Sequence, residues 1–191
     1  MKRHTIFSAI LITLIFMGCN KDKLPQLIYA GLGSGEYTAY TKVDPPHQIM
    51  FEYPSSAENY EIDADGDGTS DLKFVFIGSG SSTHTSFSMN VESMEDVEVC
   101  TGSESTWAAM LLNNAIIDDN KNWTNKTLIM HNYNYTYESA VVLTGDWTSE
   151  GTYFIGFRIK DGKDYRYGWV KITTENGASW VFSSYAIISN I

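Results

Sequence analysis

The sequence has few cysteines and few basic residues, and each scarcity excludes a class of protein. Its two cysteines are Cys19 and Cys100, so a framework of several disulfides is excluded. Lysine and arginine together number 13 against 23 acidic residues, which gives a net charge of −10 at pH 7. Because an acidic surface repels phosphate, nucleic acid is excluded as a partner.

The chain also has little of the patterning that marks catalytic sites. His47, His84 and His131 stand far apart and match no spacing that recurs in zinc sites. The glycine-rich segments 31–35 and 78–82 lack the lysine or the following helix of nucleotide-binding loops. The sequence therefore supplies no catalytic constellation and favours a protein that is not an enzyme.

Residues 1–18 have the composition of an export signal. Two basic residues precede an apolar run over residues 6–17, which is shorter than the roughly 20 residues that a membrane-spanning helix needs. The end of this run, Phe16-Met17-Gly18-Cys19, resembles the lipobox of bacterial lipoproteins. The resemblance implies cleavage before Cys19, acylation of Cys19, and anchoring in a membrane. We expect the outer membrane, on its periplasmic or its cell-surface side.

Removal of residues 1–18 leaves 11 basic and 23 acidic residues, a net charge of −12 on 173 residues. Residues 19–26 then form the acylated cysteine and a short polar tether. Residues 27–191 suit a single domain with a full core. Cys100 becomes the only free thiol, and we expect it to be buried and inert.

Hydrophobic residues alternate along most of the chain, with the period typical of β-strands. The predicted strands are rich in Tyr, Phe, Trp, Val, Ile and Thr, which favour a half-buried sheet. This pattern predicts an all-β protein, an antiparallel two-sheet β-sandwich of jelly-roll or lectin-like type. The predicted strands cover residues 37–43, 48–53, 72–77, 85–91, 97–100, 128–133, 139–143, 153–159, 169–173 and 180–185.

Turn residues separate these strands. Asp44-Pro45-Pro46 indicates a turn between the first two strands, and Asp161-Gly162 and Asn176-Gly177 indicate hairpins. One segment departs from the strand period, because residues 104–116 carry apolar side chains at helical spacing behind Ser103. That spacing predicts at most one short helix.

The stretch from Asp63 to Asp71 contains four aspartates within nine residues. Their mutual repulsion would cost stability unless a cation lay between them. Calcium prefers about six to eight oxygen ligands, and the spacing follows the first nine positions of an EF-hand loop. An acidic turn without an ion is the alternative, because Asp and Gly are common turn residues. The predicted ligands are Asp63, Asp65, Asp67, the Thr69 carbonyl and Asp71.

The end of this loop differs from an EF-hand. Phe74 stands where an EF-hand has its bidentate glutamate, and residues 72–77 alternate like a strand. The loop therefore resembles the strand-flanked aspartate loops of integrin-type propellers and thrombospondin repeats. That resemblance implies a structural calcium ion in a site that Asp71 closes. Candidates for further ligands are Glu58, Glu61 and Asp96.

The C-terminal third carries two further motifs, Gly156-Phe157-Arg158 in one predicted strand and Tyr167-Gly168-Trp169-Val170 in another. With the aspartate loop, they resemble a broad, mostly uncharacterised set of exported bacterial β-sandwich proteins, some of which are lipoproteins. The resemblance implies the fold and almost no biochemistry.

The side chains of these strands suggest particular contacts. Residues 153, 155, 157 and 159 share one face, which we expect to build core. Gly156 leaves room for an aromatic such as Trp169. Arg158 has two expected partners, an acid across the sheet or an aromatic ring. Four aromatic residues are either core or an exposed platform for sugar rings: Trp147, Tyr165, Tyr167 and Trp180.

The sequence thus predicts a non-enzymatic, lipid-anchored envelope protein with one structural calcium ion. Such a protein would serve adhesion, glycan capture or assembly with other envelope proteins. The alternative is a carbohydrate-active enzyme, a glycosidase or lyase on a lectin-like sandwich. Against this alternative, the chain is short for such an enzyme and no acid is singled out by its neighbours.

Overall fold

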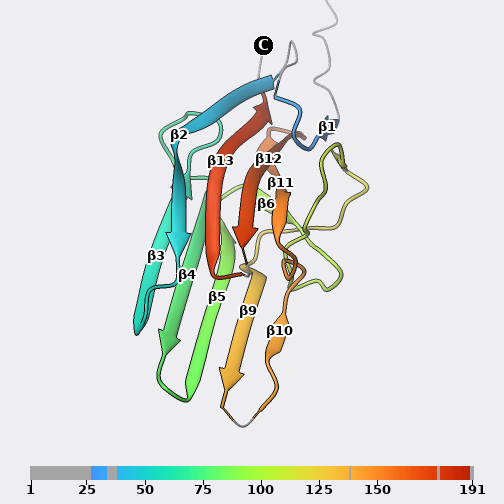
Figure 1. Ribbon diagram of the computed structural model, residues 1–191. Helices are drawn as coiled ribbons and strands as arrows, with labels where there is room; N and C mark the ends of the chain where they lie inside the picture. Colours follow the sequence, from blue (N-terminus) through green and yellow to red (C-terminus); the bar gives the residue numbers. More distant parts are fainter. Residues whose placement is uncertain (1–26, 34–37, 138, 176, 190–191) are drawn as a thin grey trace, which may run out of the picture.

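The computed structural model describes residues 27–33, 38–137, 139–175 and 177–189. They form two antiparallel sheets packed as a sandwich, with a two-stranded ribbon beside them (Figure 1). The predicted all-β sandwich is therefore confirmed. These residues contain no helix, and hence none that could cross a membrane. The predicted export signal and the tether with Cys19 lie outside the described residues.

The first sheet has five strands in the order β10-β9-β5-β4-β3. Side chains alternate between the two faces of a strand. In β4, Leu72, Phe74 and Phe76 are therefore fully buried on the inner face of the sheet, while the residues between them are more exposed. The sheet continues below the second sheet in Figure 1. Its strands are β3 (Ser55–Ile62), β4 (Leu72–Gly80), β5 (His84–Ser93), β9 (Leu128–Thr136) and β10 (Val142–Thr144).

The second sheet has six strands in the order β2-β13-β12-β11-β6-β8. Both predicted hairpins are confirmed, since β11 pairs with β12 and β12 with β13. Gly162 and Gly177 lie in their turns with φ of 61° and 65°, a conformation that favours glycine. The strands are β2 (Thr38–Met50), β6 (Val97–Cys100), β8 (Trp123–Thr124), β11 (Gly151–Asp161), β12 (Asp164–Glu175) and β13 (Ser179–Ile188).

The turn predicted at Asp44-Pro45-Pro46 is wrong, because β2 runs through these residues. Its pairing with β13 is irregular there: Lys42 lies opposite Ser184, and the next pair is His47 opposite Phe182. Proline lacks an N–H group and is tolerated in a sheet at edge strands and bulges. The two prolines therefore interrupt the ladder without ending the strand.

The short helix predicted over residues 104–116 is also wrong. This segment forms turns and isolated bridges, in which Ala108 lies opposite Thr101 and Leu111 opposite Phe154. Its apolar side chains divide between two cores: Ala108 joins one, and Ala109 and Leu111 join the other. A helix would turn its apolar side chains to one side, so the two cores favour the irregular path over the helical spacing.

The two cores lie on opposite faces of the six-stranded sheet. The first fills the space between the sheets and includes Ile155 and Phe157. The second lies under the ribbon formed by β1 (Leu27–Tyr29) and β7 (Ile116–Asp118), and it includes Phe154. Both faces of β11 therefore build core, which corrects the expectation of a single core face.

Gly156 and Cys100 belong to the second core region. Gly156 pairs with Trp169 as expected, but a Cβ atom at Gly156 would lie 3.1 Å from Leu111 Cδ1. The glycine thus makes room for Leu111 of the 104–116 segment. Cys100 is buried as predicted, and burial raises the pKa of its thiol to about 11.

Candidate metal centre

The aspartate loop, residues 63–71, connects β3 to β4. Ile62 pairs with Leu72, so the two ends of the loop lie side by side. Gly66 and Gly68 have φ of 78° and 92°, a backbone conformation that other residues rarely adopt. The Asp63 carboxylate accepts hydrogen bonds from both amides, at 2.7 Å from Gly66 N and 2.9 Å from Gly68 N. The loop is therefore wrapped around the side chain of Asp63.

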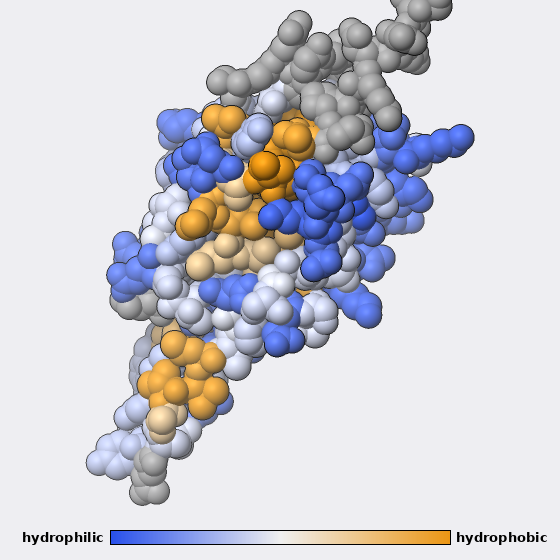
Figure 2. Space-filling model, turned by 90° about the vertical axis from the view of Figure 1, so that its right-hand side faces the viewer, coloured by the Kyte–Doolittle hydropathy of each residue, from blue (hydrophilic) through white to orange (hydrophobic). Residues whose placement is uncertain are grey.

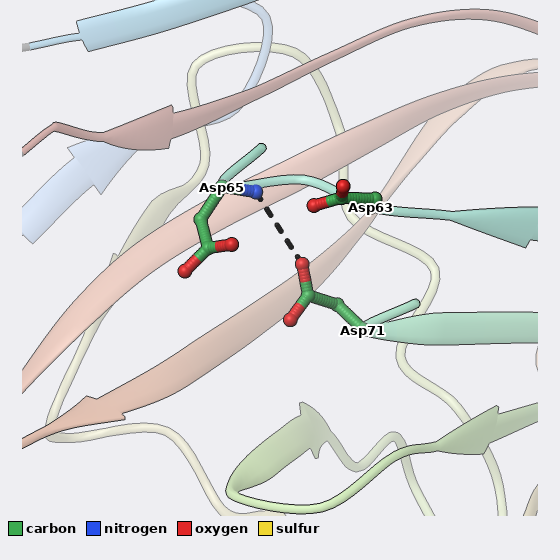
Figure 3. Close-up of side chains that lie close together, drawn as sticks. All are labelled: Asp63, Asp65 and Asp71. Atoms are coloured by element: carbon green, nitrogen blue, oxygen red, sulfur yellow. Dashed lines mark hydrogen bonds between the residues drawn. The ribbon is translucent and has the colours of Figure 1, made fainter. Parts of the chain in front are cut away.

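Three carboxylates meet in this loop. Asp63, Asp65 and Asp71 each have an oxygen atom within 4.8 Å of the other two. Figure 3 shows the Asp71 side chain pointing from the start of β4 toward the backbone of Asp65. Its Oδ2 accepts hydrogen bonds from Ala64 N at 2.7 Å and from Asp65 N at 3.4 Å. Carboxylate oxygens are the ligands that hard cations prefer, so this group is able to hold a metal ion.

Asp71 is the buried member of the group, with 8% of its surface exposed. Burial raises the pKa of its carboxyl group to about 6, and the negative charges of Asp65 and Asp63 act in the same direction. The Ala64 amide opposes them by donating to the carboxylate. Deprotonation of Asp71 is therefore less favourable than that of a free aspartate, and a bound cation would favour it.

Arg166 on β12 is a cationic neighbour of this group that the sequence did not reveal. Its Nη2 donates to Asp65 Oδ2 at 2.5 Å, and its Nε lies 3.7 Å from Asp161 Oδ2. The side chains of Arg166 and Asp65 are only 12% and 11% exposed. Arg166 thus already offsets part of the negative charge at the carboxylate cluster.

Asp67 does not belong to the cluster of three. It is exposed, and its Oδ1 accepts a hydrogen bond from Thr69 N at 2.7 Å. Its role as a ligand is therefore unsupported, and the Thr69 carbonyl stays a prediction.

The three acids proposed as further ligands lie elsewhere among the described residues. Glu58 is 3.2 Å from His47 Nε2, and Glu61 accepts a hydrogen bond from Ser70 Oγ at 2.9 Å. Asp96 lies between β5 and β6, where its carbonyl accepts from Lys160 N. None of them joins the carboxylate cluster.

The predicted aromatic platform is largely absent from the described surface. Trp147 and Trp180 are completely buried, and Tyr167 is 1% exposed. The indole of Trp147 donates to Ala108 O at 3.2 Å, and that of Trp180 donates to Gly177 O at 2.8 Å. These three aromatics are therefore core residues, the first of the two alternatives, and not part of an exposed platform.

Tyr165, the fourth aromatic, is half-buried beside Arg158. The Arg158 guanidinium lies 3.8 Å from the centre of the Tyr165 ring. It also donates to Glu98 at 2.6 Å and to Asp119 at 2.9 Å. Both expected types of Arg158 contact, with an acid across the sheet and with an aromatic ring, are therefore present. This cluster ties β6, β11 and β12 together.

Fold and site define an antiparallel β-sandwich with a carboxylate cluster able to hold a metal ion. No protein-family model matches the chain, and no curated protein or solved structure matches it significantly. The resemblance to exported bacterial sandwich proteins therefore stays a prediction.

Proposed function

We propose that this protein is an exported, lipid-anchored envelope protein whose β-sandwich is stabilised by one calcium ion in the β3–β4 loop. It acts as a binding or assembly module at the membrane. The observation that carries the calcium site is the convergence of three carboxylates, from Asp63, Asp65 and Asp71, to within 4.8 Å.

Calcium suits this cluster because all three side chains offer hard oxygen ligands. Asp63 and Asp65 are partly exposed, whereas Asp71 is buried. Water and backbone carbonyls supply the further ligands that calcium requires. Binding of the ion holds the end of β3 against the start of β4, and the unfolded chain has no equivalent set of ligands.

The anchor is supported by sequence. A basic start and a short apolar run lead to Gly18-Cys19, and two or more acyl chains suffice for stable attachment to a bilayer. The polar tether, residues 20–26, then joins Cys19 to the first strand.

Burial of Trp147, Tyr167 and Trp180 removes three of the four residues that would form an aromatic platform for glycan capture. Assembly with another envelope protein is therefore the favoured activity within the proposal. The large acidic excess suits a partner with positive charge.

Titration calorimetry of the mature protein with calcium, and separately with magnesium, tests the site. We expect calcium to bind at one site per chain and magnesium to bind more weakly, because magnesium demands a stricter geometry. Asp71→Asn should abolish binding, whereas the matched variant Asp67→Asn should retain it. Equal loss in both variants, or no heat with wild type, would contradict the site. Mass spectrometry of the N-terminal peptide tests the anchor, which requires an acylated Cys19.

A further inference from the structure

Apolar side chains are exposed around the β1–β7 ribbon. Tyr29 pairs directly with Ile116, so their side chains lie next to each other. The adjoining turns are connected to the ribbon, since Leu32 N donates to Tyr29 O and Ala115 N donates to Leu112 O. We call these residues the ribbon patch; it consists of Leu27 (38% exposed), Tyr29 (40%), Leu32 (49%), Leu112 (65%) and Ile116 (44%).

Buried residues of the same ribbon hold the ribbon patch against the rest of the protein. Ile28 and Ile117 pair with each other in the ribbon and are 6% and 0% exposed. They pack into the second core against the six-stranded sheet. Figure 2 shows one group of hydrophobic residues in the upper half of the molecule, on the side where Figure 1 places β1, and a second, separate group near its lower end. Exposed apolar patches of this kind mark surfaces that contact a protein or a membrane.

The length of the tether places the ribbon patch within reach of the bilayer. Eight residue steps separate Cys19 from Leu27, and an extended chain of that length spans at most about 28 Å. When the acyl chains of Cys19 are in the bilayer, Leu27 is therefore close to its surface.

We propose that the ribbon patch inserts into the interfacial region of the bilayer that holds the lipid anchor, and thereby fixes the orientation of the sandwich. This inference rests on the proposed acylation of Cys19. Apolar faces at such interfaces are buried by about 5–10 Å. The β4–β5 and β9–β10 turns lie at the opposite end of the molecule from β1 (Figure 1). They then point away from the membrane, where a partner can reach them.

Site-directed spin labelling of the acylated protein tests this orientation. Single cysteines replace Leu112 and Ile116 in the ribbon patch, and Tyr137→Cys serves as the matched control at the far end, where Tyr137 is 71% exposed. Native Cys100 does not interfere because it is 1% exposed and its thiol pKa is about 11. The labelled proteins are reconstituted in vesicles of phosphatidylethanolamine and phosphatidylglycerol. Collision of each label with oxygen, which concentrates in lipid, and with a water-soluble nickel chelate is then measured.

We expect labels at positions 112 and 116 to show a severalfold higher ratio of oxygen to nickel accessibility than the label at position 137. Equal, water-like ratios at all three positions would overturn the proposal. Low accessibility to both reagents at positions 112 and 116 would also overturn it, because a second protein and not lipid would then cover the patch. Mass spectrometry of the same samples separates the two proposals. An acylated Cys19 with water-like labels refutes only the docking, whereas an unmodified Cys19 refutes the anchor and the docking together.

Discussion

Arg166 and Asp65, 101 positions apart in the chain, are joined by a hydrogen bond of 2.5 Å from Nη2 to Oδ2. Asp65 also belongs to the carboxylate cluster. Arg166 therefore already places a positive charge next to a carboxylate that would bind a metal ion. Arg166 and calcium are therefore expected to compete for the same carboxylate. If the proposed site binds calcium, Arg166 would partly replace the ion in the ion-free protein and would set how strongly stability depends on calcium.

Substitution of Arg166 by Met should make the protein more dependent on calcium. Without calcium, loss of the charged partner of Asp65 should cost about 1–3 kcal/mol of the free energy of unfolding. With calcium, the ion takes over the partnership, so the calcium-induced rise in melting temperature should exceed that of wild type. Lys163→Met, which removes an exposed positive charge from the same hairpin, is the matched control. A calcium-induced rise that is equal to or smaller than that of wild type would contradict the competition.

His131→Leu should make the protein less sensitive to acid. His131 is 2% exposed, and both of its ring nitrogens are buried. Burial lowers the pKa of its ring below 6.5, although the Trp147 backbone acts in the opposite sense. The unfolded chain then takes up a proton before the folded protein does. The stability associated with neutral His131 is complete above pH 6.5 and is lost as the pH falls below that value.

Urea unfolding between about pH 5 and pH 8 measures this difference. Asp71 also has a raised pKa, near 6, so the quantity that reports on His131 is the difference between wild type and variant at each pH. That difference should shift in favour of the variant as the pH falls. A difference that stays constant across the range would show that His131 does not titrate as inferred.

Trp147→Ala should destabilise the protein by about 3–5 kcal/mol. Trp147 is completely buried, packs 5.9 Å from the Trp180 ring and donates to Ala108 O. Its removal leaves a cavity and an unpaired carbonyl in the first core. Tyr165→Ala, at a half-buried position, is the comparison and should cost clearly less. Similar losses of stability in both variants, measured by chemical denaturation, would contradict the packing of Trp147 in the first core.

The strand pattern was predictable where one face of a strand is buried. In β4 the alternation of Leu72, Phe74 and Phe76 with more exposed residues is explicit in the sequence. β3 was missed because its sequence is polar, and Ile62 is its only fully buried residue. The 104–116 segment was assigned as a helix because its apolar residues serve two cores, which sequence spacing does not distinguish from one helical face.

The part of the candidate site that lies within a single loop was predictable from the sequence. Asp63, Asp65 and Asp71 lie within one loop, and their spacing alone indicated a shared cation. Spacing did not reveal that the group of three carboxylates leaves out Asp67. The role of Arg166 could not be predicted from the sequence, because its contact with Asp65 depends on how the β11–β12 hairpin packs against the β3–β4 loop.

The melting temperature of the mature protein in millimolar calcium, compared with the same protein in EGTA, tests the calcium site most directly. A calcium concentration about a hundredfold above the dissociation constant adds about 2.7 kcal/mol, which corresponds to a rise of about 5–10 °C for a chain of this size. The rise should disappear in Asp71→Asn and persist in Asp67→Asn. An identical melting temperature with and without calcium would show that the loop is an acidic turn and not a metal site.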